Sequence, residues 1–307
     1  MHFVKETGAL PGGNRFYLYR PPEPPRAVLQ VCHGMCEYVE RYEPLADWLA
    51  QRGVLMCGAD HAGHGRTATR PEDLGYFPGG WQRLARDAYD LTAAVKREYP
   101  RLPFFLLGHS MGSFVARDYL RRYGRELDGA ILCGTSGGNP WAGLGIALAK
   151  AIAAAKGERH RSALLNRLAF SGYNSRYGGA RTAFDWLTRD RAVVDAYIAD
   201  PLCNFVFTAQ GFETLFRLLR SVSGAGWYRS VPEELPVLLI AGDMDPVGGY
   251  GKGVAKVGRR LKRAGVRDVS CTLYPGARHE LFNETNAEAV CQDILRWLET
   301  CPTEERT

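Results

Sequence analysis

The chain has 307 residues, 46% of them hydrophobic, and a formal net charge of +6. It can bury a full core, and it contains no apolar run of about 18 residues and no hydrophobic leader, so we expect neither a membrane span nor a signal peptide. The eight cysteines lack metal-ligand spacing, and no glycine-rich phosphate loop follows the first strand. We therefore expect a cytoplasmic protein without a metal or other cofactor.

Predicted strands alternate with predicted helices near the start of the chain and again near its end. A hairpin over residues 1–20 would supply antiparallel edge strands, and apolar runs at 27–32 and 54–59 predict buried strands. Apolar residues recur at helical spacing in three places: Tyr42, Leu45, Ala46 and Leu49; Leu84, Ala88, Leu91 and Val95; and Ala287, Val290, Ile294 and Leu298. This alternation predicts an α/β fold, with a mostly parallel central sheet covered by helices on both faces.

Two loops that follow the early strands carry histidines. His33 follows strand 27–32, and we interpret its ring as a group that holds the loop rather than one that transfers protons. His61 and His64 lie in a glycine-rich turn after strand 54–59. A metal site is the alternative reading there, but no third or fourth ligand lies nearby, so a structural turn is favoured.

A G-x-S-x-G motif joins the next strand to the next helix. Gly108-His-Ser110-Met-Gly112 follows the apolar run 102–107 and opens a predicted helix over 110–124. A serine at such a turn is held in a strained conformation with its hydroxyl exposed above the sheet, and the glycines let strand and helix approach. The helix N-terminus adds partial positive charge where an oxyanion would form. The motif predicts Ser110 as a nucleophile.

An acid and a histidine follow in the order that such a nucleophile requires. Apolar strands at 236–241 and 269–274 precede loops that carry Asp243 and Asp245, and then His279. Asp243 directly follows the turn glycine and is expected to cap the turn, so we favour Asp245 as the acid. We expect the oxyanion hole to be formed by the backbone N–H groups of Met35 and Met111.

A long segment interrupts the alternation of strands and helices. We predict a core domain over residues 1–133 and 231–307, and a helical lid over 134–230, with helices at 144–155 and 211–222. The apolar faces of the lid helices would line an acyl channel or pack on the core, and both readings stay open. The candidates for contact with substrate are Phe205, Phe207, Phe212 and Leu215.

The basic excess of the chain lies in this predicted lid. It holds twelve Lys and Arg against six Asp and Glu, whereas the rest of the chain holds 27 of each sign. A basic and partly apolar lid would contact anionic lipid at a membrane surface transiently. The alternative is a solvated face. Nucleic acid is not expected as a partner, because no basic run is interleaved with aromatic residues.

Five motifs together resemble a known family. The segments are 33–37 with Arg41-Tyr42 after it, 60–65, 108–112, 242–245 and 276–279, which span nearly the whole chain. They resemble the α/β-hydrolases of the monoacylglycerol lipase and lysophospholipase group, whose family also carries the label of serine aminopeptidase. The resemblance implies an α/β-hydrolase fold, Asp245 as the acid, and Met35 and Met111 as the oxyanion amides. Cys36 and Tyr38 depart from the residues usual in that family.

These observations predict a serine hydrolase that cleaves carboxylic esters. We expect a small acyl ester or lipid as substrate, most of all a monoacylglycerol or a lysophospholipid, with an acyl-enzyme on Ser110. One alternative is an aminopeptidase or amidase on the same fold, which would need carboxylates in the lid to hold a substrate ammonium. Another is a lipid-binding protein without catalytic activity, against which the intact Ser, Asp and His set argues.

Overall fold

The computed structural model describes residues 1–302, which are built around one eight-stranded sheet. The strand order is β1-β2-β4-β3-β5-β6-β7-β8; β1 pairs with β2 and β2 with β4 antiparallel, and all other pairs are parallel. The strands are β1 (Val4–Ala9), β2 (Arg15–Arg20), β3 (Ala27–Cys32), β4 (Val54–Ala59), β5 (Phe104–His109), β6 (Gly129–Cys133), β7 (Val237–Gly242) and β8 (Val269–Tyr274). The predicted hairpin and mostly parallel sheet are confirmed.

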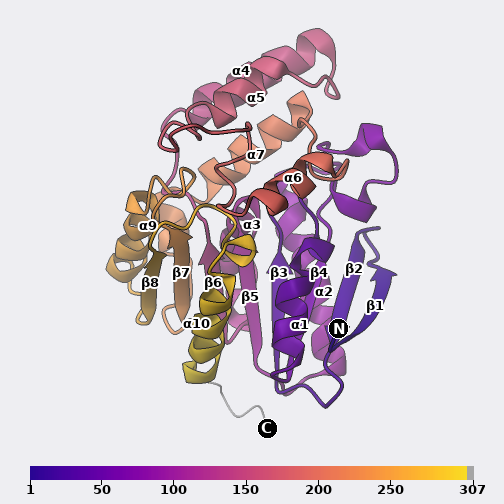
Figure 1. The fold of residues 1–307 in the computed structure, drawn as a ribbon, viewed down its shortest axis with the longest axis vertical. Helices are drawn as coiled ribbons and strands as arrows, with labels where there is room; N and C mark the ends of the chain where they lie inside the picture. The colour runs from indigo at the N-terminus through magenta and orange to yellow at the C-terminus, as the bar shows by residue number, and fades with distance from the viewer. Residues whose placement is uncertain (303–307) are drawn as a thin grey trace.

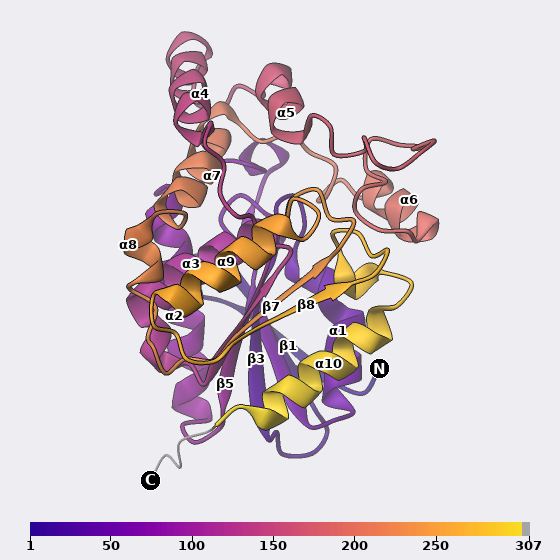
Figure 2. The same cartoon turned by 90° about the vertical axis from the view of Figure 1, so that its left-hand side faces the viewer.

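Helices cover both faces of this sheet (Figures 1 and 2). One face packs against α1 (Glu43–Ala50) and α10 (Ala287–Thr300), and the other against α2 (Trp81–Glu98), α3 (Met111–Tyr123) and α9 (Lys252–Arg263). The central strands β3, β4, β5, β6 and β7 are buried at every residue, as expected of parallel strands with helices on both sides. The two apolar layers fix the sheet and therefore the loops at its carboxyl edge.

Residues 134–230, which we call the insertion, connect β6 to β7. Its helices are α4 (Ala142–Lys156), α5 (Ala163–Phe170), α6 (Arg191–Ala199), α7 (Ala209–Ser221) and α8 (Ala225–Tyr228). Figure 1 shows α4, α5, α6 and α7 above the edge of the sheet at which the parallel strands end. Helices α4 and α7 pack closely, because Gly145 on α4 has no side chain and faces the ring of Phe216 on α7. Within residues 1–302, no helix is both long enough and apolar enough to cross a bilayer.

Candidate active site

Ser110 occupies a strained turn between β5 and α3. Its backbone angles are φ 53° and ψ −121°, in the region that residues other than glycine rarely adopt. The turn is held by a hydrogen bond from the Ser110 N–H to the Cys133 carbonyl at 3.0 Å, and the Ser113 N–H donates to the Ser110 carbonyl at 2.9 Å. Ser110 lines a cavity above the sheet. The predicted geometry of a nucleophile at a strand-to-helix turn is therefore present.

Gly112 lets this turn approach the neighbouring strand. A Cβ atom at position 112 would lie 2.0 Å from the Cys32 carbonyl oxygen and 2.4 Å from the His33 carbonyl oxygen. No side chain fits there, so the first turn of α3 packs directly on the backbone at the end of β3. This contact brings the loop after β3 next to the serine.

Asp245 and His279 form a buried pair on the loops after β7 and β8. His279 Nδ1 donates to Asp245 Oδ1 over 3.0 Å, and the Val247 N–H donates to the same oxygen over 2.8 Å. Both side chains are almost fully buried, at 0% and 2% exposed. With Nδ1 engaged, Nε2 is the nitrogen that remains to accept a proton. Asp243 instead accepts the Gly276 N–H at 2.7 Å, so its carboxylate ties the two loops together.

The two residues expected to supply the oxyanion hole, Met35 and Met111, line the same cavity as Ser110 and His279. A Cβ atom on Gly34 would lie 3.0 Å from the Ser110 Cβ, so the backbone of the loop passes directly beside the nucleophile. Met111 is the first residue of α3, and N–H groups in a first helical turn have no partner within the helix. The backbone N–H groups of Met35 and Met111 are therefore candidates for binding an oxyanion.

A buried ionic network, which sequence reasoning did not identify, fixes the loop after β3. The Glu37 carboxylate accepts hydrogen bonds from the Gly34 N–H, from the Tyr42 hydroxyl at 2.9 Å and from His109 Nδ1 at 2.7 Å. Arg41 donates to Glu37 at 3.1 Å. The network therefore joins the loop beside the serine to His109, the residue that precedes it.

The network also reaches the histidine loop. Both terminal nitrogens of Arg41 donate to the Glu280 carboxylate at 2.8 Å, and His109 Nε2 lies 3.3 Å from the His279 carbonyl oxygen. The His109 and His279 rings are in contact, with centroids 4.8 Å apart. One set of charges thus holds three loops of the site together.

The charges of this network support one another. Burial alone would raise the pKa of Glu37, but His109 and Arg41 outweigh it and hold that pKa well below its usual range. Burial acts on Glu280 in the same way, and Arg41 holds its pKa low. Burial would lower the pKa of His109, but the Glu37 carboxylate outweighs burial and raises it. The shifts of Glu37 and His109 both favour the charged form of the group, and the two ring nitrogens of His109 face the Glu37 carboxylate and the His279 carbonyl.

His33, His61 and His64 form a separate buried cluster. The His61 N–H donates to His33 Nε2 at 2.9 Å, so His33 Nδ1 donates to the Gly34 carbonyl, also at 2.9 Å. Burial lowers the pKa of all three histidines, to about 4 for His61 and about 3 for His64, which keeps the rings neutral. His33 holds its loop, in line with the interpretation made from the sequence.

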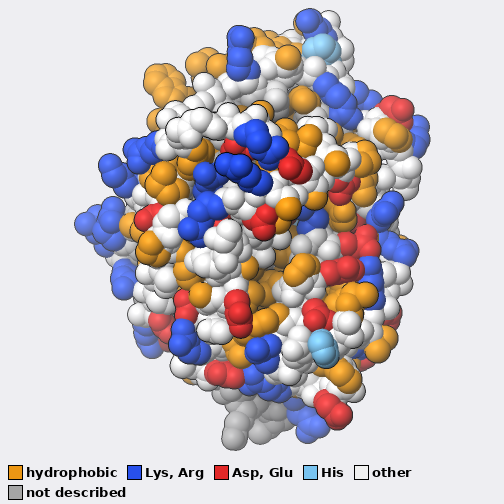
Figure 3. Space-filling model, in the orientation of Figure 1, with side chains coloured by type: hydrophobic (Ala, Val, Ile, Leu, Met, Phe, Trp, Pro, Cys, Tyr) orange, Lys and Arg blue, Asp and Glu red, His pale blue; other side chains and the backbone are white. Residues whose placement is uncertain are grey.

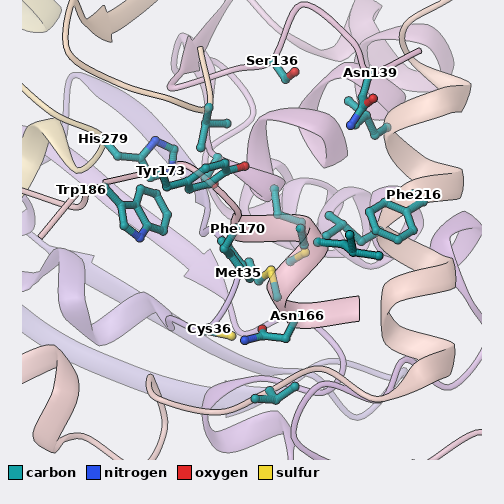
Figure 4. A pocket seen from close by; sticks show the side chains of 18 of the residues that line it. Met35, Cys36, Ser136, Asn139, Asn166, Phe170, Tyr173, Trp186, Phe216 and His279 are labelled. Carbon is teal, nitrogen blue, oxygen red and sulfur yellow. The ribbon is translucent and has the colours of Figure 1, made fainter. Parts of the chain in front are cut away.

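A cavity of about 580 Å³ extends from Ser110 into the insertion. Figure 4 shows side chains that line it, among them Met35, Phe216 and His279. Its wall is mostly apolar, with Leu144 and Leu148 from α4 and Leu215 and Phe216 from α7. A few polar side chains also line it, among them Ser136, Asn139 and Asn166. An apolar cavity with few polar groups is typical of a site for a small molecule with a hydrocarbon portion.

Two of the four residues expected to contact substrate line this cavity, and two do not. Phe205 and Leu215 lie in its wall. Phe207 and Phe212 are fully buried behind it: the Phe207 ring packs on Phe77 with centroids 5.2 Å apart, and the Phe212 ring stacks behind Phe216. These two rings support the wall instead of forming its surface.

An aromatic group that was not foreseen lines the cavity beside His279. Phe170, Tyr173 and Trp186 come from α5 and from the loop that follows it. That loop has no regular apolar spacing, so its sequence gave no sign of these positions. The motif at 33–42 did contain Glu37 and Arg41, and that pattern was the available signal for the ionic network.

The sheet, the serine turn and the Asp–His pair define an α/β-hydrolase, the class in which a serine is activated at the carboxyl edge of a parallel sheet. Residues 23–286 match the family described as "Serine aminopeptidase, S33", and the chain belongs to this family. The expected fold and the expected family are both confirmed.

Similar proteins agree with this assignment. The chain is 30% identical over 299 residues to a monoacylglycerol lipase of Mycolicibacterium smegmatis, covering 94% of each chain. It is 27% identical over 295 residues to the monoglyceride lipase of Homo sapiens, covering 91% of this chain and 84% of that one. A thermostable carboxyl esterase from Bacillus coagulans, solved with glycerol, superposes with a TM-score of 0.90 at 31% identity over 98% and 99% of the two chains. These relatives support the expected function, a carboxylic ester hydrolase of the monoacylglycerol lipase type.

Proposed function

We propose that this protein is a serine hydrolase that cleaves the ester of a single acyl chain, with Ser110, His279 and Asp245 as its catalytic residues. The observation that carries the proposal is the apolar cavity that begins at the strained serine and is lined by His279, which Asp245 orients. Relatives named as monoacylglycerol lipases and a carboxyl esterase support an ester as the substrate.

The reaction follows from the positions of these groups. His279 Nε2 accepts the Ser110 proton as Oγ attacks the ester carbonyl, and Asp245 stabilises the imidazolium. The Met35 and Met111 N–H groups bind the oxyanion, with the N-terminus of α3 adding partial positive charge. His279 then protonates the leaving alcohol. Water, deprotonated by the same imidazole, attacks the acyl-enzyme, and the fatty acid leaves as Ser110 regains its proton.

The chemistry of the cavity favours a monoacylglycerol or a lysophospholipid. Leu144, Leu148, Leu215 and Phe216 suit one hydrocarbon chain, whereas Ser136, Asn139 and Asn166 supply hydrogen bonds suited to an alcohol. We place the acyl chain between α4 and α7, and the insertion over residues 134–230 acts as the lid that covers it. Phe205 and Leu215 would contact substrate.

The charges around the cavity disfavour the aminopeptidase alternative. Glu37 and Glu280 line the cavity, and both are committed to Arg41 or His109. The acids of the insertion are engaged elsewhere. Asp190 caps α6, Asp195 pairs with Arg181, and Glu213 pairs with Arg217. The other three acids of the insertion, Asp185, Asp200 and Glu158, accept hydrogen bonds from Thr182, Tyr38 and Tyr76. Among the described residues that line the cavity, no free carboxylate is thus offered to a substrate ammonium.

A panel of substrates separates the three candidate functions. We expect hydrolysis of 1-monoacylglycerols and of p-nitrophenyl acyl esters, with no release of the same chromophore from aminoacyl p-nitroanilides. The reason is that the site has an apolar channel and no free anion. Anilide cleavage without esterase activity would favour the aminopeptidase. Binding of monoacylglycerol without turnover would favour the lipid-binding protein.

We further propose that the insertion touches lipid surfaces transiently. Trp141, Leu144 and Leu168 are 71%, 66% and 57% exposed and all line the cavity, so its mouth is apolar. Figure 3 shows basic and apolar side chains side by side over the upper part of the molecule, where the insertion lies. Exposed apolar groups beside cations suit an anionic lipid surface. We also propose a cytoplasmic location, which the eight cysteines support because all of them are free thiols and seven are buried.

Vesicle binding tests this contact. We expect the protein to sediment with vesicles containing phosphatidylglycerol, and less with pure phosphatidylcholine, with binding lost at high salt. Leu144→Ser should weaken the binding because it removes an exposed apolar side chain at the mouth. Leu273→Ser is the matched control, since Leu273 is 38% exposed on β8, outside the insertion. Equal binding by the two variants would contradict the assignment to the insertion.

A further inference from the structure

A tryptophan of the insertion lies against the imidazole of the site. The ring centroids of Trp186 and His279 are 5.0 Å apart, with 42° between the planes. Figure 4 shows the two side chains next to each other at the wall of the cavity. Trp186 is 7% exposed and His279 is 2% exposed, so the contact excludes water. The indole thus covers one side of the imidazole.

The backbone on both sides of Trp186 is bonded to the loop that carries the histidine. The Glu280 N–H donates to the Leu187 carbonyl at 2.7 Å. The Arg278 guanidinium donates to the Asp185 carbonyl. The residues that flank Trp186 in the chain are therefore hydrogen-bonded to the residues that flank His279. These bonds hold the indole against the imidazole.

A buried carboxylate strengthens this connection. The Glu284 side chain is 0% exposed and accepts hydrogen bonds from Arg189 Nε at 2.8 Å and from the Arg189 N–H at 3.1 Å. It also accepts the Arg278 N–H at 2.8 Å. Glu284 thus joins residue 189 of the insertion to the residue that precedes His279. Residues 185–189, which we call the strap, are thus attached to the histidine loop through Asp185, Leu187 and Arg189.

Two more aromatic rings hold the indole from the insertion side. The Tyr173 ring lies edge-on to Trp186 with centroids 4.9 Å apart, and the Phe170 ring lies 6.0 Å away at 31°. An indole face attracts a cation more strongly than other aromatic side chains do, and the attraction grows when water is excluded. A neutral imidazole is attracted far less than an imidazolium.

We propose that the strap positions His279 for catalysis and that the Trp186 ring stabilises the imidazolium formed when His279 accepts the Ser110 proton. The inference rests on the proposed function, because it assumes that His279 is the base. The attraction is largest in the transition state, where the ring is charged, so it acts on kcat more than on binding. The insertion then contributes to the chemistry as well as to the acyl channel.

Other charged groups also face the imidazole. Asp245 approaches from the loop after β7, and His109 packs on the ring from the end of β5. Glu280 is paired with Arg41, and Arg278 precedes the histidine in the chain. All of these groups remain when Trp186 is replaced, so a change in pH dependence between two variants reports the indole.

The experiment compares Trp186→Leu and Trp186→Phe with wild type on a short soluble p-nitrophenyl ester. We expect kcat to fall about tenfold in Trp186→Leu and less in Trp186→Phe, with KM changed by less than about twofold. The acid limb of kcat/KM should move to lower pH in Trp186→Leu, because the imidazolium is less stable without the indole. A loss of packing alone would admit water to the imidazole, which favours its charged form, and would therefore not move this limb to lower pH.

Trp48→Leu is the matched control. Trp48 lies on α1 and is not among the residues that line the cavity. The Arg52 guanidinium stacks on its ring, 3.6 Å from the centroid, and loss of this indole should leave kcat and the acid limb unchanged. Trp186→Leu with wild-type kcat and an unmoved acid limb would overturn the proposal, as would a limb moved to higher pH. Failure of the proposed function is distinguishable, because wild type itself would then neither turn over the ester nor react with a fluorophosphonate.

Discussion

Replacing Asp245 with asparagine should lower kcat for ester hydrolysis by about 10⁴-fold, the scale that this change has in other Ser–His–Asp enzymes. Asp245 is fully buried, and its Oδ1 accepts a hydrogen bond from His279 Nδ1 at 3.0 Å. An amide of the same shape can fill the space but offers no negative charge to an imidazolium. We expect KM and the unfolding midpoint to change little, and steady-state kinetics with a soluble ester measures the effect.

Asp243→Asn is the matched control for this prediction. Asp243 lies two residues away and accepts the Gly276 N–H at 2.7 Å, a hydrogen bond that an asparagine oxygen also makes. Its kcat should therefore stay within about tenfold of wild type. Equal losses in the two variants, or a larger loss for Asp243→Asn, would reverse the assignment of the acid.

Replacing Arg41 with methionine should destabilise the fold by about 3–5 kcal/mol, the usual range when one partner of a buried ion pair is removed. Arg41 is the cation shared by Glu37 and Glu280, whose side chains are each 4% exposed. Methionine fills the space of the arginine stem but leaves Glu280 without a cation. Urea unfolding measures the change. The control is Arg70→Met, because Arg70 is 66% exposed and pairs with Asp73 at the surface. Its replacement should change the free energy of unfolding little.

The pKa shifts in the network predict the pH range in which it stabilises the fold. The pKa values of Glu37 and Glu280 in the folded protein are held below the ordinary 4.5. Their contribution to the free energy of unfolding is therefore present above pH 4.5 and is lost as the pH falls through those lowered pKa values. The pKa of His109 is raised above 6.5, so its contribution is present below pH 6.5 and is lost as the pH rises through the folded value. The network is thus complete between these limits.

The difference in unfolding free energy between wild type and Arg41→Met should depend on pH in the range where Glu280 becomes protonated. In the variant, the main group that holds the pKa of Glu280 low is gone, so the variant gains less stability than wild type from ionisation of that carboxylate. The difference in unfolding free energy should be largest above about pH 5 and should shrink as the pH falls. A difference that is the same at every pH from 3.5 to 7 would show that Arg41 acts through packing alone.

The sheet and the Ser, Asp and His set could be predicted because their physical requirements are local. A buried strand needs a short apolar run, and a serine at a strand-to-helix turn needs glycines around it, as Gly112 shows by its 2.0 Å approach to the Cys32 carbonyl. The strand predicted at 102–107 forms at Phe104–His109 instead, because Pro103 cannot donate a backbone hydrogen bond within the sheet. The shift leaves Ser110 at the turn.

The cavity wall could not be predicted in the same way. Phe205 and Phe207 are two residues apart, yet only the first lines the cavity, because the second packs on Phe77 and His64 from a distant part of the chain. Trp186 lies in a loop without periodicity, and its position depends on hydrogen bonds to residues about 90 positions later. Such contacts arise only in the folded chain.

Labelling with a fluorophosphonate, followed by mass spectrometry of the digested protein, tests most directly whether Ser110 is the nucleophile. The probe forms a covalent bond only with a serine whose hydroxyl is activated by a neighbouring base. We predict one modified serine, residue 110, with labelling abolished in Ser110→Ala and strongly slowed in Asp245→Asn. Labelling at another residue, or a label that persists in Ser110→Ala, would contradict the account.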